Sequence, residues 1–356
     1  MKKSILILCC LFFVSALNAQ LCYYSADEFP LLGKVNNDTE TRYERLGAEV
    51  KEKISRPYLW QLGKNTAGLA IRFRTNSKTI GAKWTLFSNT HMNHMAPTGT
   101  KGLDLYCLKE GKWKFVNSGR PGSEKDNEAT LISDMKGEEL EYMLYLPLYD
   151  GVTKLEIGVD SLATIKQPEV ESPKRNQSIV WYGTSITQGG CASRPGMAHT
   201  NILSRMLDRE IINLGFSGNG RLDYEIAEYM VKKDAALFVL DCMPNVEEAE
   251  VLEKLEKFYR IIRDKHPTTP ILFVQNPWFS LMEFSKGSYN SVTKKNKALD
   301  KEFARLLKAD QHIYFQSSGE FLGDDGEATV DGIHFTDLGF MRCANVMLPL
   351  LKEILE

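Results

Sequence analysis

Residues 178–189 read Ser-Ile-Val-Trp-Tyr-Gly-Thr-Ser-Ile-Thr-Gln-Gly, a short apolar run followed by small and polar residues. Similar runs recur later in the chain, at 211–214, 236–240 and 271–275. Helix-length stretches lie between or after them, at 247–264, 293–307 and 336–355. Strands that are apolar along their whole length are buried on both faces, and their alternation with helices predicts a parallel sheet in an α/β domain.

The region before this segment has a different period. Between about 69 and 159, apolar and polar residues alternate, as in Ile71-Arg-Phe-Arg74 and Leu155-Glu-Ile157, and Gly and Asn clusters separate the runs. This alternation is typical of half-buried antiparallel strands. We therefore predict an all-β sandwich or jelly-roll domain over 24–165, a Pro-rich charged linker over 166–176, and the α/β domain over 177–356.

The first residues resemble an export signal. Lys2 and Lys3 precede an apolar run from Ile5 to Ala16, and small residues precede Gln20. This order predicts a signal peptide over 1–19, cleaved near Ala19, and a secreted or periplasmic protein. The alternative is a buried N-terminal helix. We expect no membrane span, because the run is too short, and no nucleic-acid partner, because the net charge is −2.

Five cysteines remain beyond residue 19, and none has the CxxC spacing of a structural zinc site. Cys191 and Cys242 both lie near the ends of predicted strands. We expect two buried free thiols there, with a disulfide between them as the alternative. His91 and His94 have the i, i+3 spacing of a metal pair, but no carboxylate or cysteine near them in sequence completes a site. A loop-packing role is expected for this pair, and no metal or cofactor is predicted.

Chemistry-bearing residues follow the predicted strands at their carboxyl ends, where open α/β sheets form their sites. They are Gly183-Thr-Ser185, Gly215-Phe-Ser-Gly218, Asp241-Cys-Met-Pro-Asn245 and, in a loop before the last helix, Asp331-Gly-Ile-His334. Together these segments supply a hydroxyl, flexible glycines, an amide and an Asp/His pair. These are the components of acyl transfer by a serine nucleophile.

These four segments, in this order, resemble the blocks of the SGNH (GDSL-like) hydrolase superfamily, in a secreted bacterial type with an N-terminal β-sandwich domain. The resemblance implies a flavodoxin-like three-layer fold and a Ser185–His334–Asp331 triad. It also implies an oxyanion hole made by the backbone N–H groups of Ser185 and Gly218 and the side chain of Asn245. Thr184 stands where the family usually has Asp, and the third block lacks the common Gly-x-Asn-Asp.

Each residue also has a plainer interpretation. Ser185 could cap a helix, Gly218 could serve a turn, and Asn245 could cap the helix that begins near Val246. Three further residues are candidates for substrate contact: Trp278, Arg194 and His94. For Trp278 the alternative is core packing, and for Arg194 it is a tether for its loop.

The resemblance implies a metal-free serine esterase. Secretion, a β domain that could shape or cover the site, and the resembled family's frequent action on acylated sugars favour a carbohydrate esterase that acts on acetyl esters. The expected partner is a small-molecule or polysaccharide acyl ester. A lipid or lysophospholipid acylhydrolase is the alternative among enzymes. From another class, the chain could be a glycan-binding protein that has lost activity, although the intact Ser, His, Asp and Asn favour an enzyme.

Overall fold

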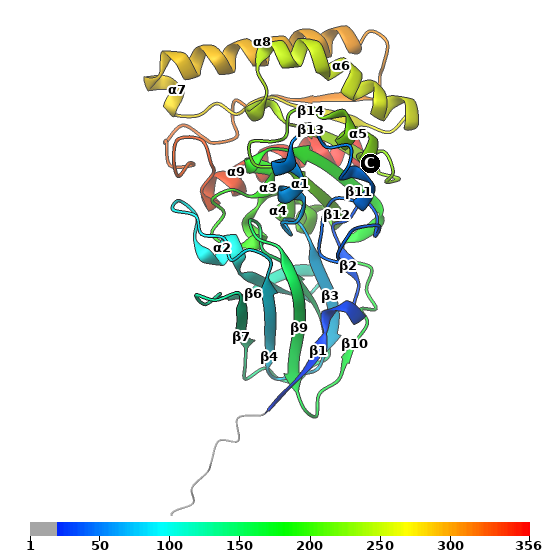
Figure 1. The fold of residues 1–356 in the computed structure, drawn as a ribbon, viewed down its shortest axis with the longest axis vertical. Coiled ribbons are helices and arrows are strands. Elements are labelled where there is room, and N and C mark those ends of the chain that lie inside the picture. The colour runs from blue at the N-terminus through cyan, green and yellow to red at the C-terminus, as the bar shows by residue number, and fades with distance from the viewer. Residues whose placement is uncertain (1–19) are drawn as a thin grey trace, which may run out of the picture.

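The computed structural model describes residues 20–356, so the predicted signal peptide lies outside the described residues. Two halves are stacked along the long axis of the molecule, a β-rich half that begins the chain and an α/β half that ends it (Figure 1). The predicted fold class is confirmed, with antiparallel sheets in the first half and a parallel sheet in the second. Within residues 20–356, no helix is both long and apolar enough to cross a membrane.

The β-rich half contains two antiparallel sheets. One has the strand order β1-β9-β4-β7, and the other has the order β10-β3-β8-β5-β6 with β2 also paired to β3. The strands are β1 (Leu21–Ser25), β2 (Leu31–Leu32), β3 (Ala70–Thr75), β4 (Ile80–Leu86), β5 (Leu103–Lys109), β6 (Lys112–Gly119), β7 (Asp126–Ile132), β8 (Leu140–Tyr145), β9 (Val152–Asp160) and β10 (Ile165–Lys166). Apolar residues of both sheets share one core, in which Phe73, Trp84 and Ile157 are buried. This is the layering expected of a sandwich.

The α/β half is built on a five-stranded parallel sheet. Its order is β12-β11-β13-β14-β15, which is the 2-1-3-4-5 order of flavodoxin-like folds. The strands are β11 (Lys174–Gly183), β12 (Arg209–Gly215), β13 (Leu237–Asp241), β14 (Ile271–Val274) and β15 (Ile313–Gln316). The strand β15 was not predicted from the sequence. It is an edge strand that is only partly buried, so it lacks the fully apolar run of the inner strands.

Helices cover both faces of this sheet and explain why its strands are apolar throughout. Val180 and Tyr182 of β11 belong to the core beneath α5, α6 and α8, whereas Ile179 and Trp181 belong to the core beneath α4 and α9. The helices of the chain are η1 (Ala26–Glu28), η2 (Ala48–Val50), α1 (Pro57–Gly63), α2 (Pro97–Lys101), α3 (Ser185–Gln188), η3 (Pro195–Met197), α4 (His199–Leu207), α5 (Tyr224–Met230), η4 (Met243–Asn245), α6 (Glu248–Lys265), α7 (Leu281–Phe284), α8 (Lys286–Leu306) and α9 (Asp337–Leu355).

The segment between β2 and β3 leaves the sandwich and packs on the α/β half. Leu46, Leu59 and Leu62 of this segment are buried in the same core as β11 and β12. Arg45 is fully buried and donates hydrogen bonds to the carbonyl oxygens of Asn213 (3.1 Å) and Gly215 (2.8 Å). The end of β12, which leads into the predicted site, is therefore supported by the N-terminal half of the chain.

Candidate active site

Ser185 lies where β11 turns into the short helix α3. The strand ends at Gly183, Thr184 caps the helix by accepting from the N–H of Ile186 (3.3 Å), and Ser185 is the first helical residue. A Cβ on Gly183 would come within 1.9 Å of Thr187 Oγ1, so only glycine allows so tight a turn. The Ser185 side chain is thereby held at the carboxyl edge of the sheet.

His334 and Asp331 reach this serine from the loop before α9. Ser185 Oγ lies 2.9 Å from His334 Nε2, and His334 Nδ1 lies 2.7 Å from Asp331 Oδ2. The other carboxylate oxygen of Asp331 accepts from the N–H groups of Ile333 (3.1 Å) and His334 (2.8 Å). Burial acts to raise the pKa of Asp331, but these hydrogen bonds from His334 and Ile333 outweigh it and hold the pKa below its usual value. The carboxylate is therefore kept ionised beside the imidazole.

Gly218 and Asn245 face each other next to the serine-bearing strand. Gly218 has φ +66°, a conformation that favours glycine, and open space surrounds the position of a Cβ. The Asn245 amide nitrogen lies 3.4 Å from the Phe216 carbonyl oxygen. With the amide turned over, its oxygen would accept from the N–H groups of residues 218, 219 and 220 at 3.3, 3.1 and 3.2 Å. In either orientation, Asn245 stabilises the turn that presents Gly218.

The β-rich half contributes two residues to the site. Tyr149, which follows β8, donates from its hydroxyl to the Ser185 carbonyl oxygen at 3.1 Å. His94, in the loop between β4 and α2, places its ring 5.6 Å from the ring of His334. The sequence singled out His94, whereas Tyr149 was missed. No local pattern marks Tyr149, because it reaches Ser185 only through the packing of one half on the other.

Arg194 binds the β-rich half. Its guanidinium donates to Asp104 Oδ2 and to the Tyr106 hydroxyl, both at 2.7 Å, and lies 3.8 Å above the Phe115 ring. Asp104 is fully buried and also accepts from the N–H of Gly196 (2.8 Å). These contacts favour the tether, one of the two roles open to Arg194 from the sequence, over substrate binding.

Cys191 and Cys242 are both buried free thiols, as expected; all five cysteines in residues 20–356 are unpaired. Burial, with a smaller contribution from Asp331, raises the pKa of Cys191 to about 12. The thiol is therefore neutral at ordinary pH and is no second nucleophile.

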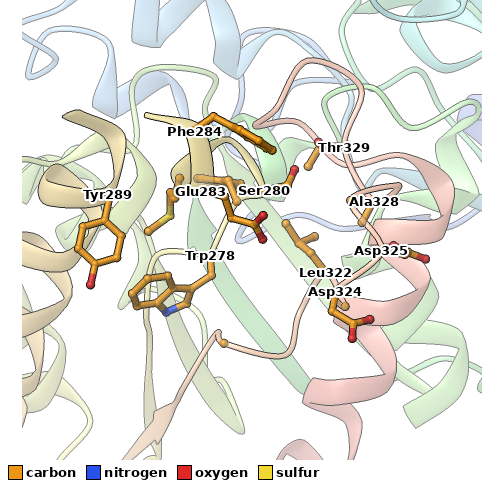
Figure 2. A pocket seen from close by; sticks show the side chains of 15 residues that line it. Trp278, Ser280, Glu283, Phe284, Tyr289, Leu322, Asp324, Asp325, Ala328 and Thr329 are labelled. Carbon is orange, nitrogen blue, oxygen red and sulfur yellow. The ribbon is translucent and has the colours of Figure 1, made fainter. Parts of the chain in front are cut away.

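Trp278 is partly exposed and lines a pocket of about 620 Å³ beside the triad loop. Figure 2 shows Trp278 and Tyr289 on one side of this pocket, Asp324 and Asp325 on the other, and the Glu283 carboxylate between them. Ala328 and Thr329, which also line it, lie just before the triad loop in sequence. A Cβ on Gly332, between the two triad residues, would lie 3.5 Å from Leu281 of α7. The triad loop therefore lies against α7, and Met282, Glu283 and Phe284 of this helix line the pocket.

The fold and this geometry define an ester-hydrolysing enzyme of the SGNH type. The chain belongs to the GDSL-like lipase/acylhydrolase family, whose model matches residues 176–352. A second model, GxDLY, describes the N-terminus of SGNH-hydrolase-type esterases and matches residues 21–165. Residues 102–106 read Gly-Leu-Asp-Leu-Tyr, and the Asp and Tyr of this pattern are the partners of Arg194.

One solved structure supports this family assignment, and two more distant ones share the fold. A GDSL-like lipase from Bacteroides ovatus is 40% identical, with a TM-score of 0.89 over 94% of this chain and 98% of that one. The salicylyl-acyltransferase SsfX3 from a tetracycline biosynthetic pathway (17% identity, TM-score 0.77, 94% and 97% covered) shares the fold. A family two carbohydrate esterase from Cellvibrio japonicus also shares the fold, with 13% identity and a TM-score of 0.59 over 94% of this chain and 98% of that one. A search of curated proteins found no match.

Proposed function

We propose that this protein is a secreted serine esterase that removes acetyl groups from carbohydrates. The observation that carries the mechanism is the hydrogen-bonded series from Ser185 Oγ to His334 to Asp331, with distances of 2.9 and 2.7 Å. In this proposal Asp331 keeps the proton on His334 Nδ1, so that Nε2 accepts the proton of Ser185 as the serine attacks the ester carbonyl. An acyl-enzyme forms, and water then releases the acid.

The developing negative charge on the carbonyl oxygen requires hydrogen-bond donors. The N–H of Ser185 is one of the first N–H groups of α3, which have no acceptor within the helix. The N–H of Gly218 makes at most the long 3.3 Å contact with a turned Asn245 amide, which an oxyanion can replace. With its oxygen on the turn, Asn245 leaves its NH₂ group to act as the third donor.

The pocket in Figure 2 supports a carbohydrate as the substrate. Flat aromatic faces such as Trp278 stack on sugar rings, and the exposed carboxylates of Glu283 and Asp324 can accept hydrogen bonds from hydroxyl groups. The shared fold of a family two carbohydrate esterase makes acetylated polysaccharides the first substrates to test.

The mechanism is tested by the hydrolysis of aryl acetate and aryl octanoate by the wild type, Ser185→Ala and the control Ser317→Ala, which changes an exposed serine. We expect rapid acetate hydrolysis, slow octanoate hydrolysis, and loss of both only in Ser185→Ala. Equal rates for Ser185→Ala and wild type would refute the serine mechanism. Faster octanoate hydrolysis would instead favour the lipid acylhydrolase, and inactivity on all esters would favour the glycan-binding protein.

The substrate class needs a separate test. Trp278→Ala and Glu283→Gln should raise KM for acetate release from acetylated polysaccharide and leave kinetics on aryl acetate unchanged, because the small ester does not reach the pocket. Equal effects on the two substrates would contradict a sugar site there.

Secretion is tested on protein recovered from the periplasm or medium of an expressing bacterium. Its first residue should be Gln20, and retention of Met1 in an exported protein would contradict the cleavage site.

A further inference from the structure

Three potential metal ligands meet beside the nucleophile. His94 of the β-rich half, Cys191 of the turn after α3, and His334 each place a ligand atom within 4.8 Å of the others. In the sequence His94 had no partner except His91, because Cys191 and His334 lie far along the chain. Tertiary packing completes a set of ligands with two imidazole nitrogens and one sulfur.

Both imidazoles have an oxygen partner at Nδ1, as metal-binding histidines commonly do. His94 Nδ1 lies 2.9 Å from the Asn93 side-chain oxygen, and His334 Nδ1 lies 2.7 Å from Asp331 Oδ2. Since these oxygens accept, each Nδ1 carries the hydrogen and each Nε2 presents a lone pair. Metal-binding histidines almost always donate their other N–H to such an oxygen, which fixes the ring and raises its basicity.

Cys191 supplies the soft ligand. Its side chain makes no hydrogen bond within residues 20–356, and its backbone has φ +71°, which is uncommon for a residue other than glycine. Nitrogen and thiolate ligands favour Zn²⁺ over Mg²⁺ and Ca²⁺, which prefer oxygen ligands.

We propose that His94, Cys191 and His334 form a Zn²⁺ site that inactivates the esterase while it is occupied. Zinc bonds to the Cys191 sulfur as the thiol proton leaves to solvent, and to one nitrogen of each imidazole. Bonding to the His334 Nε2 lone pair removes the acceptor for the Ser185 proton, so the serine cannot be activated. Water takes the fourth position, as in open zinc sites.

The spacing requires a small adjustment. A tetrahedral zinc holds its nitrogen and sulfur ligands roughly 3.3–3.6 Å apart, so the three atoms must approach one another. His94 is in a loop and only partly buried, and it can turn inward while His334 keeps its contact with Asp331. Movement of the loop between β4 and α2, which carries His94, would therefore bring the three ligand atoms to zinc-binding distance.

The inhibition test rests on the proposed esterase activity. Aryl acetate hydrolysis is measured during titration with ZnCl₂ and then with EDTA, each variant being normalised to its own metal-free rate. Zinc should inhibit the wild type, and EDTA should restore the rate. Cys191→Ser and His94→Ala should each raise the zinc concentration for half inhibition by about 100-fold or more, since lost outer-shell partners alone cost roughly 10–100-fold. The control Cys22→Ser, on β1 at the far end of the β-rich half (Figure 1), should match the wild type.

Binding is tested independently of catalysis. Co²⁺ added to Ser185→Ala should produce a thiolate-to-cobalt charge-transfer absorption that zinc removes. The band should be lost in the double variants with Cys191→Ser and His94→Ala and kept with Cys22→Ser. A band in an enzyme that hydrolyses no ester would leave the zinc site standing while the proposed function fails. Absence of the band, or zinc inhibition that is equal in all variants, would overturn the zinc site.

Discussion

The hydroxyl of Tyr149 donates a hydrogen bond to the carbonyl oxygen of Ser185 at 3.1 Å, across the boundary between the two halves. The same carbonyl accepts from the N–H groups of Gly189 (3.0 Å) and Gly190 (2.7 Å). A Cβ on Gly190 would lie 2.8 Å from the Tyr149 hydroxyl and 3.1 Å from His334 Cδ2, so glycine is needed for this packing. The β-rich half therefore helps to position the nucleophile.

Tyr149→Phe removes this contact while keeping the ring. We expect a loss of about 1 kcal/mol in the free energy of unfolding, typical of one buried hydrogen bond, and a fall in kcat with little change in KM. Urea unfolding and aryl acetate kinetics measure both. Tyr142→Phe removes a buried hydroxyl remote from the site, bonded to Met135, and should leave kcat unchanged. An unchanged kcat in Tyr149→Phe would exclude a positioning role.

Asp331→Asn should abolish most activity without unfolding the protein. An amide that donates to His334 Nδ1 would favour the wrong imidazole tautomer, and the loss in kcat of such a change is about 10⁴-fold. The measurement is steady-state hydrolysis of aryl acetate beside Asp264→Asn, which alters an exposed carboxylate on α6. A loss below tenfold would contradict the role of Asp331.

Asn245→Ala tests the oxyanion hole. Removing one donor lowers kcat by about 10²–10³-fold, and KM should change little because the donor acts on charge that develops in the transition state. A stability readout must accompany the kinetics, since Asn245 also stabilises the turn before Gly220. The helix-cap role that the sequence left open for Asn245 is wrong, because Glu247 caps α6 and Asn245 lies in η4. If Asn245 only supports the turn, unfolding would become easier while kcat in the folded enzyme stayed near the wild-type value.

Arg45→Met should destabilise the whole chain. The Arg45 guanidinium donates hydrogen bonds to four carbonyl oxygens, those of Leu62, Asn65, Asn213 and Gly215. In the variant each of these carbonyl oxygens would lose its hydrogen bond from Arg45 inside the protein. We expect a cost of about 3 kcal/mol or more in the free energy of unfolding. Arg260→Met removes an exposed pair with Glu256 and should cost at most about 1 kcal/mol. Similar urea midpoints for the two variants would contradict this account.

Asp241→Asn should change how stability depends on pH. Burial raises the pKa of Asp241 from 3.8 to about 7, against the opposing hydrogen bonds from Trp181 and Thr187. The folded state therefore holds a proton that the unfolded state has lost, and this residue's contribution to stability falls as pH rises from about 4 to 7. The free energy of unfolding of the variant should therefore rise relative to that of the wild type over this range, by up to about 4 kcal/mol above pH 7. Urea unfolding at several pH values measures the gain, and a constant difference would contradict the raised pKa.

The sequence anticipated most of the α/β half because its signals are local. Strands buried on both faces are continuous apolar runs, so β11 to β14 were found, and Ser185, Gly218 and Asn245 follow three of them. The helix predicted over 247–264 lies within one residue of α6, because the apolar residues of an amphipathic surface helix recur with the helical period along its whole length. The start of α8 was missed because its first turns, from Lys286, carry no apolar periodicity.

The roles of residues that act through the contact between the two halves could not be predicted from the sequence. Tyr149 and Cys191 bear no local mark of their places beside Ser185 and His334. The two roles of Arg194 could be separated only by seeing Asp104 and Tyr106 at its guanidinium.

By itself the sequence determined the parallel sheet, the order of its chemical groups and their convergence at one edge. This follows because hydrophobic periodicity fixes the strands, and parallel strands bring their carboxyl ends together. Only the tertiary structure decided what surrounds that edge: a tyrosine beneath the nucleophile, a histidine and a thiol beside the base, and a pocket with aromatic, aliphatic and acidic side chains near the triad loop. Such contacts join residues that are distant in the chain, and their geometry arises from the packing of two cores that no local pattern encodes.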